Sequence, residues 1–230
     1  MRYCVSDIHG EYELFSKLLK RINFSNDDEM FICGDIIEKG DKSVELARYI
    51  SSFSNIHCII GNHEYAFLKY YQSLLQKSPD DFDEVLRKLQ IYLLGDGARL
   101  DWDLVDWLEC LPYYIEREDF ICVHAGVPVL QNGELMDLAK ASEEELVYDR
   151  TFKEARIKHS SEKCVFFGHT PTFVMCGESK ILGYLRAPNS PPKNVADFYK
   201  IHLDTGSHAR GVLGCFCIDT LKAIYVKKDS

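Results

Sequence analysis

Apolar residues in the first third of the chain form short continuous runs, and each run precedes a stretch in which apolar residues return at helical spacing. These pairs are residues 2–6 with 13–22, residues 30–33 with 42–53, and residues 56–60 with 65–75. Polar residues separate the two members of each pair. Strands that alternate with helices at this spacing predict βαβ units, in which parallel strands end at the same edge of a sheet.

The rest of the chain continues this mixed pattern, with one interruption. Helices are predicted at residues 82–94, 104–111 and 142–147, and strands at residues 113–115, 120–123, 164–167, 201–204, 212–218 and 223–226. Periodicity is lost between residues 175 and 200, where glycine and proline recur, so we expect an irregular insertion there. The length of 230 residues fits one core, and we predict a single α/β domain over residues 1–230.

Composition narrows the function classes and the compartment. The chain has 27 Lys and Arg against 36 Asp and Glu, a formal charge of −9, which argues against a basic surface for nucleic acid. No apolar run reaches the roughly 18 residues of a membrane helix, and the start has no signal-peptide pattern, so we expect a cytoplasmic protein without a membrane partner. The cysteines number nine and several lie in apolar runs, which favours small core residues over a thiolate metal site.

Side chains that can bind metals follow five of the predicted strands. They are Asp7 and His9, Asp35, Asn62 and His63, His124, and His169. Oxygen and imidazole ligands without thiolates suit manganese, iron or zinc, and hydrolytic sites often hold two such ions about 3.5–4 Å apart. Asp35 ends an apolar run, where an unpaired carboxylate would be strongly destabilised. We therefore predict that Asp35 lies at the centre of the site, where a carboxylate between two ions can bridge both.

Five motifs in chain order resemble those of the calcineurin-like metallophosphoesterases. They are Asp7-Ile8-His9-Gly10, Gly34-Asp35-Ile36-Ile37-Glu38-Lys39-Gly40, Gly61-Asn62-His63-Glu64, His124-Ala125-Gly126 and Gly168-His169-Thr170. Within that family the chain looks most similar to the bacterial and phage serine/threonine protein phosphatases of the phosphoprotein phosphatase type, and the likeness extends over nearly the whole chain. The resemblance implies an α/β sandwich of two mixed β-sheets flanked by helices.

The resemblance also implies a centre of two divalent metal ions. The first ion would be held by Asp7, His9 and Asp35, and the second by Asp35, Asn62, His124 and His169. Manganese is the expected metal, with iron and zinc as alternatives. The implied reaction is attack on phosphorus by a hydroxide bound between the two ions, without a phosphoenzyme intermediate.

Other motif residues are similar to the catalytic and phosphate-binding groups of the family. His63 resembles the general acid that protonates the leaving oxygen, and Glu38 stands where an aspartate usually orients that histidine. Lys39 and Arg150 are the expected phosphate-binding residues, and Lys39 and Ile60 both stand where arginine is usual. An ammonium neutralises phosphate as a point charge but does not form the two parallel hydrogen bonds of a guanidinium. Glu38 and Lys39 could instead pair with each other at the surface.

These observations favour a metal-dependent phosphomonoesterase, with a serine/threonine protein phosphatase as the main hypothesis. Its substrate would be a phosphoprotein, a phosphopeptide or a small phosphate ester. The alternative enzyme is a bis(5'-nucleosyl)-tetraphosphatase, because dinucleoside polyphosphate hydrolases share the five motifs and also depart from Asp-Arg in the segment 34–40. A third hypothesis is an inactive phosphate-binding module, which the retention of the expected ligands and of His63 argues against. The aromatic residues between Tyr65 and Tyr71 are expected to pack rather than to stack nucleobases.

Overall fold

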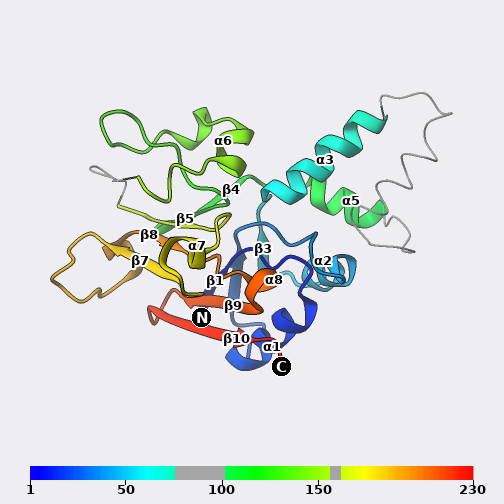
Figure 1. Ribbon diagram of the computed structural model, residues 1–230, viewed down its shortest axis with the longest axis horizontal. Coiled ribbons are helices and arrows are strands. Elements are labelled where there is room, and N and C mark those ends of the chain that lie inside the picture. The colour runs from blue at the N-terminus through cyan, green and yellow to red at the C-terminus, as the bar shows by residue number, and fades with distance from the viewer. Residues whose placement is uncertain (76–101, 156–161, 230) are drawn as a thin grey trace.

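The computed structural model describes residues 1–75, 102–155 and 162–229, and it contains two five-stranded mixed sheets (Figure 1). The first sheet has the order β10-β9-β1-β2-β3. Its strands are β1 (Arg2–Val5), β2 (Glu29–Ile32), β3 (Ile56–Cys58), β9 (Val212–Cys217) and β10 (Lys222–Lys227). β1, β2 and β3 are parallel, as the alternation of strands and helices predicts, whereas β9 runs antiparallel to β1 and β10 antiparallel to β9.

The second sheet has the order β4-β5-β6-β8-β7 and the same mixed character. Its strands are β4 (Tyr114–Glu116), β5 (Phe120–Val123), β6 (Cys164–Phe167), β7 (Leu182–Leu185) and β8 (Phe198–His202). The central strands β5, β6 and β8 are parallel, and the two edge strands are antiparallel to their neighbours. Each sheet therefore brings the carboxyl ends of three parallel strands to one edge.

The two sheets pack against each other through a layer of apolar side chains and cysteines. Phe31 of the first sheet contacts Phe120 of the second with ring centroids 5.0 Å apart, and Phe166 lies behind Phe120 at 5.6 Å. Sγ of Cys4 lies 3.7 Å from Sγ of Cys122 across the same layer. All nine cysteines are free thiols; seven are buried, including those in the apolar runs, whereas Cys110 and Cys176 are exposed.

Helices pack around both sheets. α1 (Tyr12–Ile22) packs on β9 and β10, and α6 (Glu143–Tyr148) packs on the second sheet. α5 (Trp102–Glu109) contacts both α2 (Ser43–Ser51) and α3 (Asn62–Leu75) at the side of the sandwich, and these three helices share the apolar cluster of the first sheet (Figure 1). The short helices are α7 (Thr172–Cys176), α8 (Ser207–Arg210), η2 (Leu138–Lys140) and η3 (Val195–Asp197). α1 shows why these segments are helical: Leu14, Phe15 and Leu18 are buried at helical spacing, and Asn23 ends the helix in a left-handed conformation with φ of 52°. Within the described ranges, no helix is long and apolar enough to cross a membrane.

The predicted fold class is confirmed, and most element boundaries agree with the sequence pattern. α3 begins at Asn62, three positions before the predicted start at Tyr65, and the helix predicted at 82–94 lies outside the described residues. β7 and the first residues of β8 lie in the segment 175–200, where the sequence shows no periodicity. The reason is that β7 is an edge strand without a fully buried residue, so its side chains do not alternate between core and solvent. The single domain over residues 1–230 stays a prediction.

Lys200 of β8 is a buried cation that holds the chain segment after α6. Its Nζ donates to the carbonyls of Phe152, Lys153 and Ala155 at 2.6, 3.0 and 3.0 Å, and the residue is only 3% exposed. The ammonium also lies 4.9 Å from the ring centroid of Phe152 and 4.9 Å from that of Tyr184. Burial lowers the pKa of Lys200 to about 8, so the residue remains charged at neutral pH. Lys200 thereby fixes the turn that follows Arg150.

Replacing Lys200 with methionine is expected to lower the free energy of unfolding by roughly 3 kcal/mol, because buried carbonyls would lose their donor. Urea denaturation of Lys200→Met at pH 7 measures this change. Lys222→Met, at an exposed position of β10, is the matched control and should stay within about 0.5 kcal/mol of the unmodified protein. Equal unfolding midpoints for the two variants would contradict the assigned role of Lys200.

Candidate metal centre

The loops after the parallel strands of the two sheets meet at one edge of the sandwich. The amide of Asp7, after β1, donates to the carbonyl of Gly34 at 3.1 Å, and the amide of His9 donates to the carbonyl of Asp35 at 2.9 Å. These bonds join the loops after β1 and β2. The amide of His169, after β6 of the second sheet, donates to the carboxylate of Asp7 at 3.0 Å. The polar ends of both sheets are therefore linked directly.

Several of these loop residues adopt the left-handed backbone conformation that non-glycine residues rarely take. The φ angles are 52° at Asp7, 52° at His9, 56° at Asp35 and 69° at His169. Such conformations persist where the surrounding structure enforces them, and they cluster at functional sites. Gly61 permits a close approach of the third loop, because a Cβ at this position would lie 2.2 Å from Oδ1 of Asp35.

Asp35 belongs to two groups of side chains whose ligand-type atoms lie within 4.8 Å of one another. His9 and His63 complete one group, and Asp7 and His124 complete the other. Nε2 of His9 lies 3.6 Å from Oδ2 of Asp35, whereas Nε2 of His124 lies 3.4 Å from Oδ1. The two carboxylate oxygens of Asp35 thus face different groups, which is the arrangement that a bridging ligand requires.

Asn62 and His169 extend the second group. Oδ1 of Asn62 lies 2.9 Å from Nε2 of His124 and 2.7 Å from Nδ1 of His169. Asn62 and His63 are the first two residues of α3, so the start of one helix supplies side chains to both groups. The structure therefore brings together all six residues that the sequence predicts as metal ligands.

Hydrogen bonds and burial hold the histidines in the form that binds metals. Nδ1 of His124 donates to the carbonyl of Cys33 at 2.8 Å, and Nδ1 of His9 faces the carbonyl of Ile37 at 3.3 Å. In each ring Nε2 is then left to present its lone pair to the site. Burial lowers the pKa of His9 to about 3 and that of His169 to about 3. Both imidazoles are consequently neutral at physiological pH.

The carboxylates of the site are buried close to one another. Burial raises the pKa of Asp35 well above its usual value, and the charges of Asp7 and Glu64 raise it further. This repulsion is relieved when cations lie between the carboxylates. A donor set of carboxylate, amide oxygen and imidazole fits manganese, iron or zinc. The residues present therefore suit a pair of divalent metal ions.

His63 and Glu38 form a hydrogen-bonded pair at the edge of the first group. Nδ1 of His63 bonds to the carboxylate of Glu38, and Nε2 lies 3.8 Å from Oδ2 of Asp35. Burial lowers the pKa of His63, but the bond to Glu38 and the charge of Asp35 outweigh this effect, so the pKa is raised above its usual value. The ring is thus held in one orientation and keeps its proton more readily than a free histidine.

The two predicted phosphate-binding residues lie on different sides of the site. Nζ of Lys39 lies 2.8 Å from Nε2 of His9. Arg150 donates from Nη1 to Oγ1 of Thr170 at 3.2 Å, and its charge contributes to the lowered pKa of His169. In the part of the chain that the structure describes, no ion pair joins Lys39 to Glu38, so the alternative of a simple surface pair is not observed.

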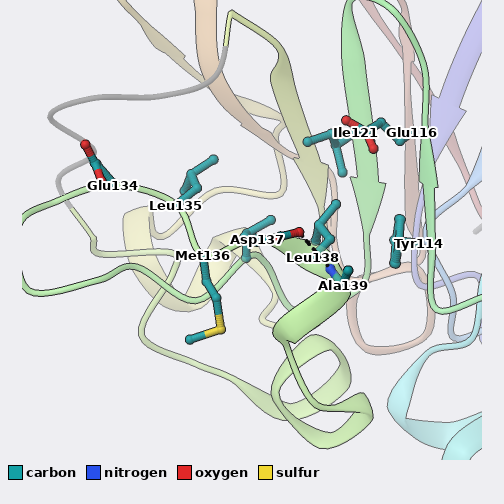
Figure 2. A pocket seen from close by; sticks show the side chains of 10 residues that line it. Tyr114, Glu116, Ile121, Glu134, Leu135, Met136, Asp137, Leu138 and Ala139 are labelled. Carbon is teal, nitrogen blue, oxygen red and sulfur yellow. Dashed lines mark hydrogen bonds between the residues drawn. The ribbon is translucent and has the colours of Figure 1, made fainter.

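A separate pocket lies on the outer side of the second sheet, away from the candidate metal centre. It has a volume of about 560 Å³, and its lining comes from β4, β5 and residues 134–139 (Figure 2). Asp137 in this lining accepts a hydrogen bond from the amide of Ala139 at 3.1 Å and so caps η2. None of the predicted site residues lines this pocket.

Comparison with known proteins agrees with this geometry. The sequence matches the family model of the calcineurin-like phosphoesterases over residues 3–200. The chain belongs to this family. It is a metallophosphoesterase, and members of the family use a centre of two divalent metal ions. The groups that share Asp35 are the corresponding candidates in this phosphoesterase.

Two bacterial relatives carry the same name, symmetrical bis(5'-nucleosyl)-tetraphosphatase. The protein of Vibrio parahaemolyticus is 31% identical to this phosphoesterase over 127 residues, which cover 54% of the chain and 44% of the relative. The protein of Wigglesworthia glossinidia brevipalpis is 29% identical over 181 residues, which cover 75% of the chain and 63% of the relative. The chain thus spans less than half the length of the Vibrio protein.

Solved structures show the same fold. The crystal structure of a candidate diadenosine tetraphosphatase superposes with a TM-score of 0.70 at 19% identity, covering 98% of this phosphoesterase and 92% of that chain. The metallophosphoesterase of Sphaerobacter thermophilus superposes with a TM-score of 0.59 at 16% identity, and the superposition covers 99% of this phosphoesterase and 87% of that chain. At these identities the likeness concerns the fold alone.

Glu64 has a role in this phosphoesterase that sequence reasoning did not assign. The residue is fully buried, and its carboxylate accepts hydrogen bonds from the amides of Asp35 and Gly61, both at 2.9 Å. It also accepts from the amides of Ile36 at 2.8 Å and Ile37 at 3.0 Å. Glu64 therefore fastens the loop that carries Asp35 to the start of α3. The only hint of this role in the sequence was the position of Glu64 at the end of the motif Gly61-Asn62-His63-Glu64.

Replacing Glu64 with glutamine is expected to weaken both the fold and the metal centre. The amide group would point a donor at backbone amides, so the free energy of unfolding should fall by roughly 3 kcal/mol. Metal affinity should fall about 10- to 100-fold, the usual effect of losing a group that orients a ligand. Urea denaturation in chelator and calorimetric titration with manganese measure the two effects.

The control for this experiment is Glu118→Gln, which makes the same chemical change at an exposed position. It should leave stability and metal affinity unchanged. If Glu64→Gln behaved like Glu118→Gln in both measurements, Glu64 would not be fastening the Asp35 loop.

Proposed function

We propose that this calcineurin-like phosphoesterase hydrolyses dinucleoside polyphosphates, cutting a bis(5'-nucleosyl) tetraphosphate at its central phosphoanhydride. The observation that carries the proposal is the pair of ligand groups that share Asp35, because two cations held there can neutralise adjoining phosphates. The names of the two bacterial relatives support this substrate class. The chain spans only part of these relatives, so their activity is an expectation for this protein and not a property already assigned to it.

In the proposed site, one divalent cation would be held by Asp7, His9 and Asp35, since Nε2 of His9 lies 3.9 Å from Oδ1 of Asp7 and 3.6 Å from Oδ2 of Asp35. The other would be held by Asp35, Asn62, His124 and His169, and Asp7 also lies in the group of Asp35 and His124. Cations bound there would lower the pKa of a water molecule, which makes it a nucleophile near neutral pH, and would neutralise the charge of the phosphoryl oxygens. Manganese is the proposed metal, and iron and zinc suit the same ligands.

The remaining roles belong to side chains around the two ligand groups. His63 donates a proton to the leaving phosphate oxygen, and its raised pKa favours the protonated form that this role requires. Glu38 is a positioning residue, because it acts through Nδ1 of His63. Arg150 binds a phosphate oxygen on the His169 side, and Lys39 adds a positive charge on the His9 side.

The protein phosphatase reading, which is the main hypothesis from the sequence, has less support than its alternative. Both named bacterial relatives are tetraphosphatases. Lys39 and Ile60 replace arginines of the protein phosphatases, and Ile60 is buried in the apolar core, where it cannot reach a phosphate.

A substrate comparison tests the proposed function. With manganese, diadenosine tetraphosphate and one water molecule should give two molecules of ADP, and kcat/KM should exceed the value for a phosphothreonine peptide. Chromatography of the nucleotides and a phosphate assay measure the two reactions. Asp35→Asn should abolish both, because it changes the shared ligand. ATP and AMP as products would contradict the central cut, and turnover of the peptide alone would restore the protein phosphatase hypothesis.

Glu38→Gln should change the pH dependence of hydrolysis. The carboxylate of Glu38 helps to raise the pKa of His63, so its neutralisation lowers this pKa. A general acid is active only when protonated, so the alkaline limb of kcat/KM should move to lower pH. Glu38→Asp keeps the charge and should keep the limb near its original position. Superimposable profiles for the glutamine variant and the unmodified enzyme would contradict the role of Glu38.

A further inference from the structure

Tyr148, the last residue of α6, presents an aromatic ring to solvent beside the candidate metal centre. The residue is 43% exposed. Its ring meets that of Tyr65 edge-on, with centroids 5.8 Å apart and an interplanar angle of 83°. Tyr65 is only 7% exposed and in turn contacts Tyr113 at 6.1 Å. Tyr65 thus packs in the core, as predicted, and supports Tyr148 from below, while the exposed ring surface belongs to Tyr148.

Both tyrosines are close in sequence and in space to residues of the proposed site. Tyr65 follows His63 by two positions in the first turn of α3, and Tyr148 precedes Arg150 by two positions. α3 and α6 contact each other, which brings these segments together (Figure 1). Burial raises the pKa of Tyr148, and the charges of Tyr65 and Asp35 add to the effect. The contact between α3 and α6 therefore places Tyr148 next to the segments that carry His63 and Arg150.

Tyr148 also lines a pocket of about 690 Å³ at the surface. Pro128 and Val129 give this pocket an apolar wall, and Glu144, Glu145 and Asp149 give it carboxylates. Glu145 and Asp149 already accept hydrogen bonds from Ser142 and Thr151. The carboxylates repel phosphate, so a polyphosphate chain is favoured on the side of Arg150 and disfavoured in the pocket. A neutral heterocycle with exocyclic amino groups is instead favoured in the pocket, because it can stack on the aromatic ring and donate hydrogen bonds to carboxylates.

We propose that the exposed face of Tyr148 stacks a nucleobase of the substrate while Arg150 binds the adjoining phosphate chain. This inference rests on the proposed function and adds a binding site for one nucleoside. Stacking on an aromatic side chain tolerates any base, because every base has a π face. In this arrangement the phosphate chain of the substrate binds at the metal centre and Arg150, and the neutral base binds at the ring of Tyr148.

Two inhibitors that differ only by the nucleoside test the proposal. ADP and inorganic pyrophosphate carry the same phosphoanhydride, so the ratio of their inhibition constants isolates the contribution of the nucleoside. Tyr148→Ala should weaken inhibition by ADP, relative to inhibition by pyrophosphate, by about 5- to 150-fold, the range expected for one stacked base. Tyr148→Phe keeps the ring and should keep the ratio of the unmodified enzyme. Tyr225→Ala, at another exposed tyrosine, is the remote control.

A second variant gives a direct binding signal. Tyr148→Trp should report ADP binding through quenching of its fluorescence, and pyrophosphate should cause no quenching. A ratio of inhibition constants unchanged in Tyr148→Ala, an equal change in Tyr148→Phe, or the absence of quenching by ADP would each overturn the stacking proposal. A thermal melt of each variant identifies any change in folding, which would affect both inhibitors alike.

This experiment separates the stacking proposal from the proposed function. The inhibition constants are measured against whichever substrate the enzyme turns over, a dinucleoside tetraphosphate or a phosphopeptide. Hydrolysis of diadenosine tetraphosphate with an unchanged ratio rejects only the stacking role of Tyr148. Turnover of the phosphopeptide alone rejects the proposed function, and the ADP titration of Tyr148→Trp then decides independently whether this surface binds a base.

Discussion

The site depends on buried negative charge gathered around Asp35. This carboxylate is 1% exposed, and burial together with the charges of Asp7 and Glu64 raises its pKa well above the usual value. The charge of Glu64 is met by backbone amides, among them that of Asp35 itself. The two oxygens of Asp35 instead face separate groups of imidazoles. Oδ1 of Asp35 accepts one amide bond, from His63 at 3.1 Å, but one such bond does not offset the burial and the neighbouring carboxylates, so the arrangement calls for cations on both sides of Asp35.

The topology of the two sheets makes this gathering of charge possible. Parallel strands place their carboxyl ends at one edge of each sheet, and the sheets pack so that the two edges meet. The junction is held by polar contacts as well as by packing. The amide of His169 donates to Asp7, and Ser207 donates to the carbonyl of the same residue. Left-handed backbone at Asp7 and Asp35 is tolerated because these bonds hold the loops in place.

The side chains of the candidate metal centre were predictable because their residue types are unusual after apolar strands. The periodicity located the strands, and each strand end then identified its own polar residues, from Asp7 to His169. Glu64 could not be assigned in this way, because its role depends on amides that approach it only in the folded chain. β7 was missed for a related reason: an edge strand packs one side incompletely, and its sequence therefore lacks the alternation that marks a strand.

Substrate preference depends on where positive charge is available in an acidic protein. With a formal charge of −9, the surface as a whole repels polyanions, so a phosphate chain must be attracted locally. Lys39 and Arg150 are the proposed sources of that attraction, but an ammonium without an arginine at position 60 binds a single phosphate weakly. In the proposed binding mode, a chain of phosphates would distribute its charge over the two ligand groups that share Asp35 and over both side chains. In the proposed binding mode a neutral base would lie where Glu144 and Asp149 disfavour phosphate, so this charge pattern supports the proposal of a nucleoside polyphosphate over an acidic phosphopeptide.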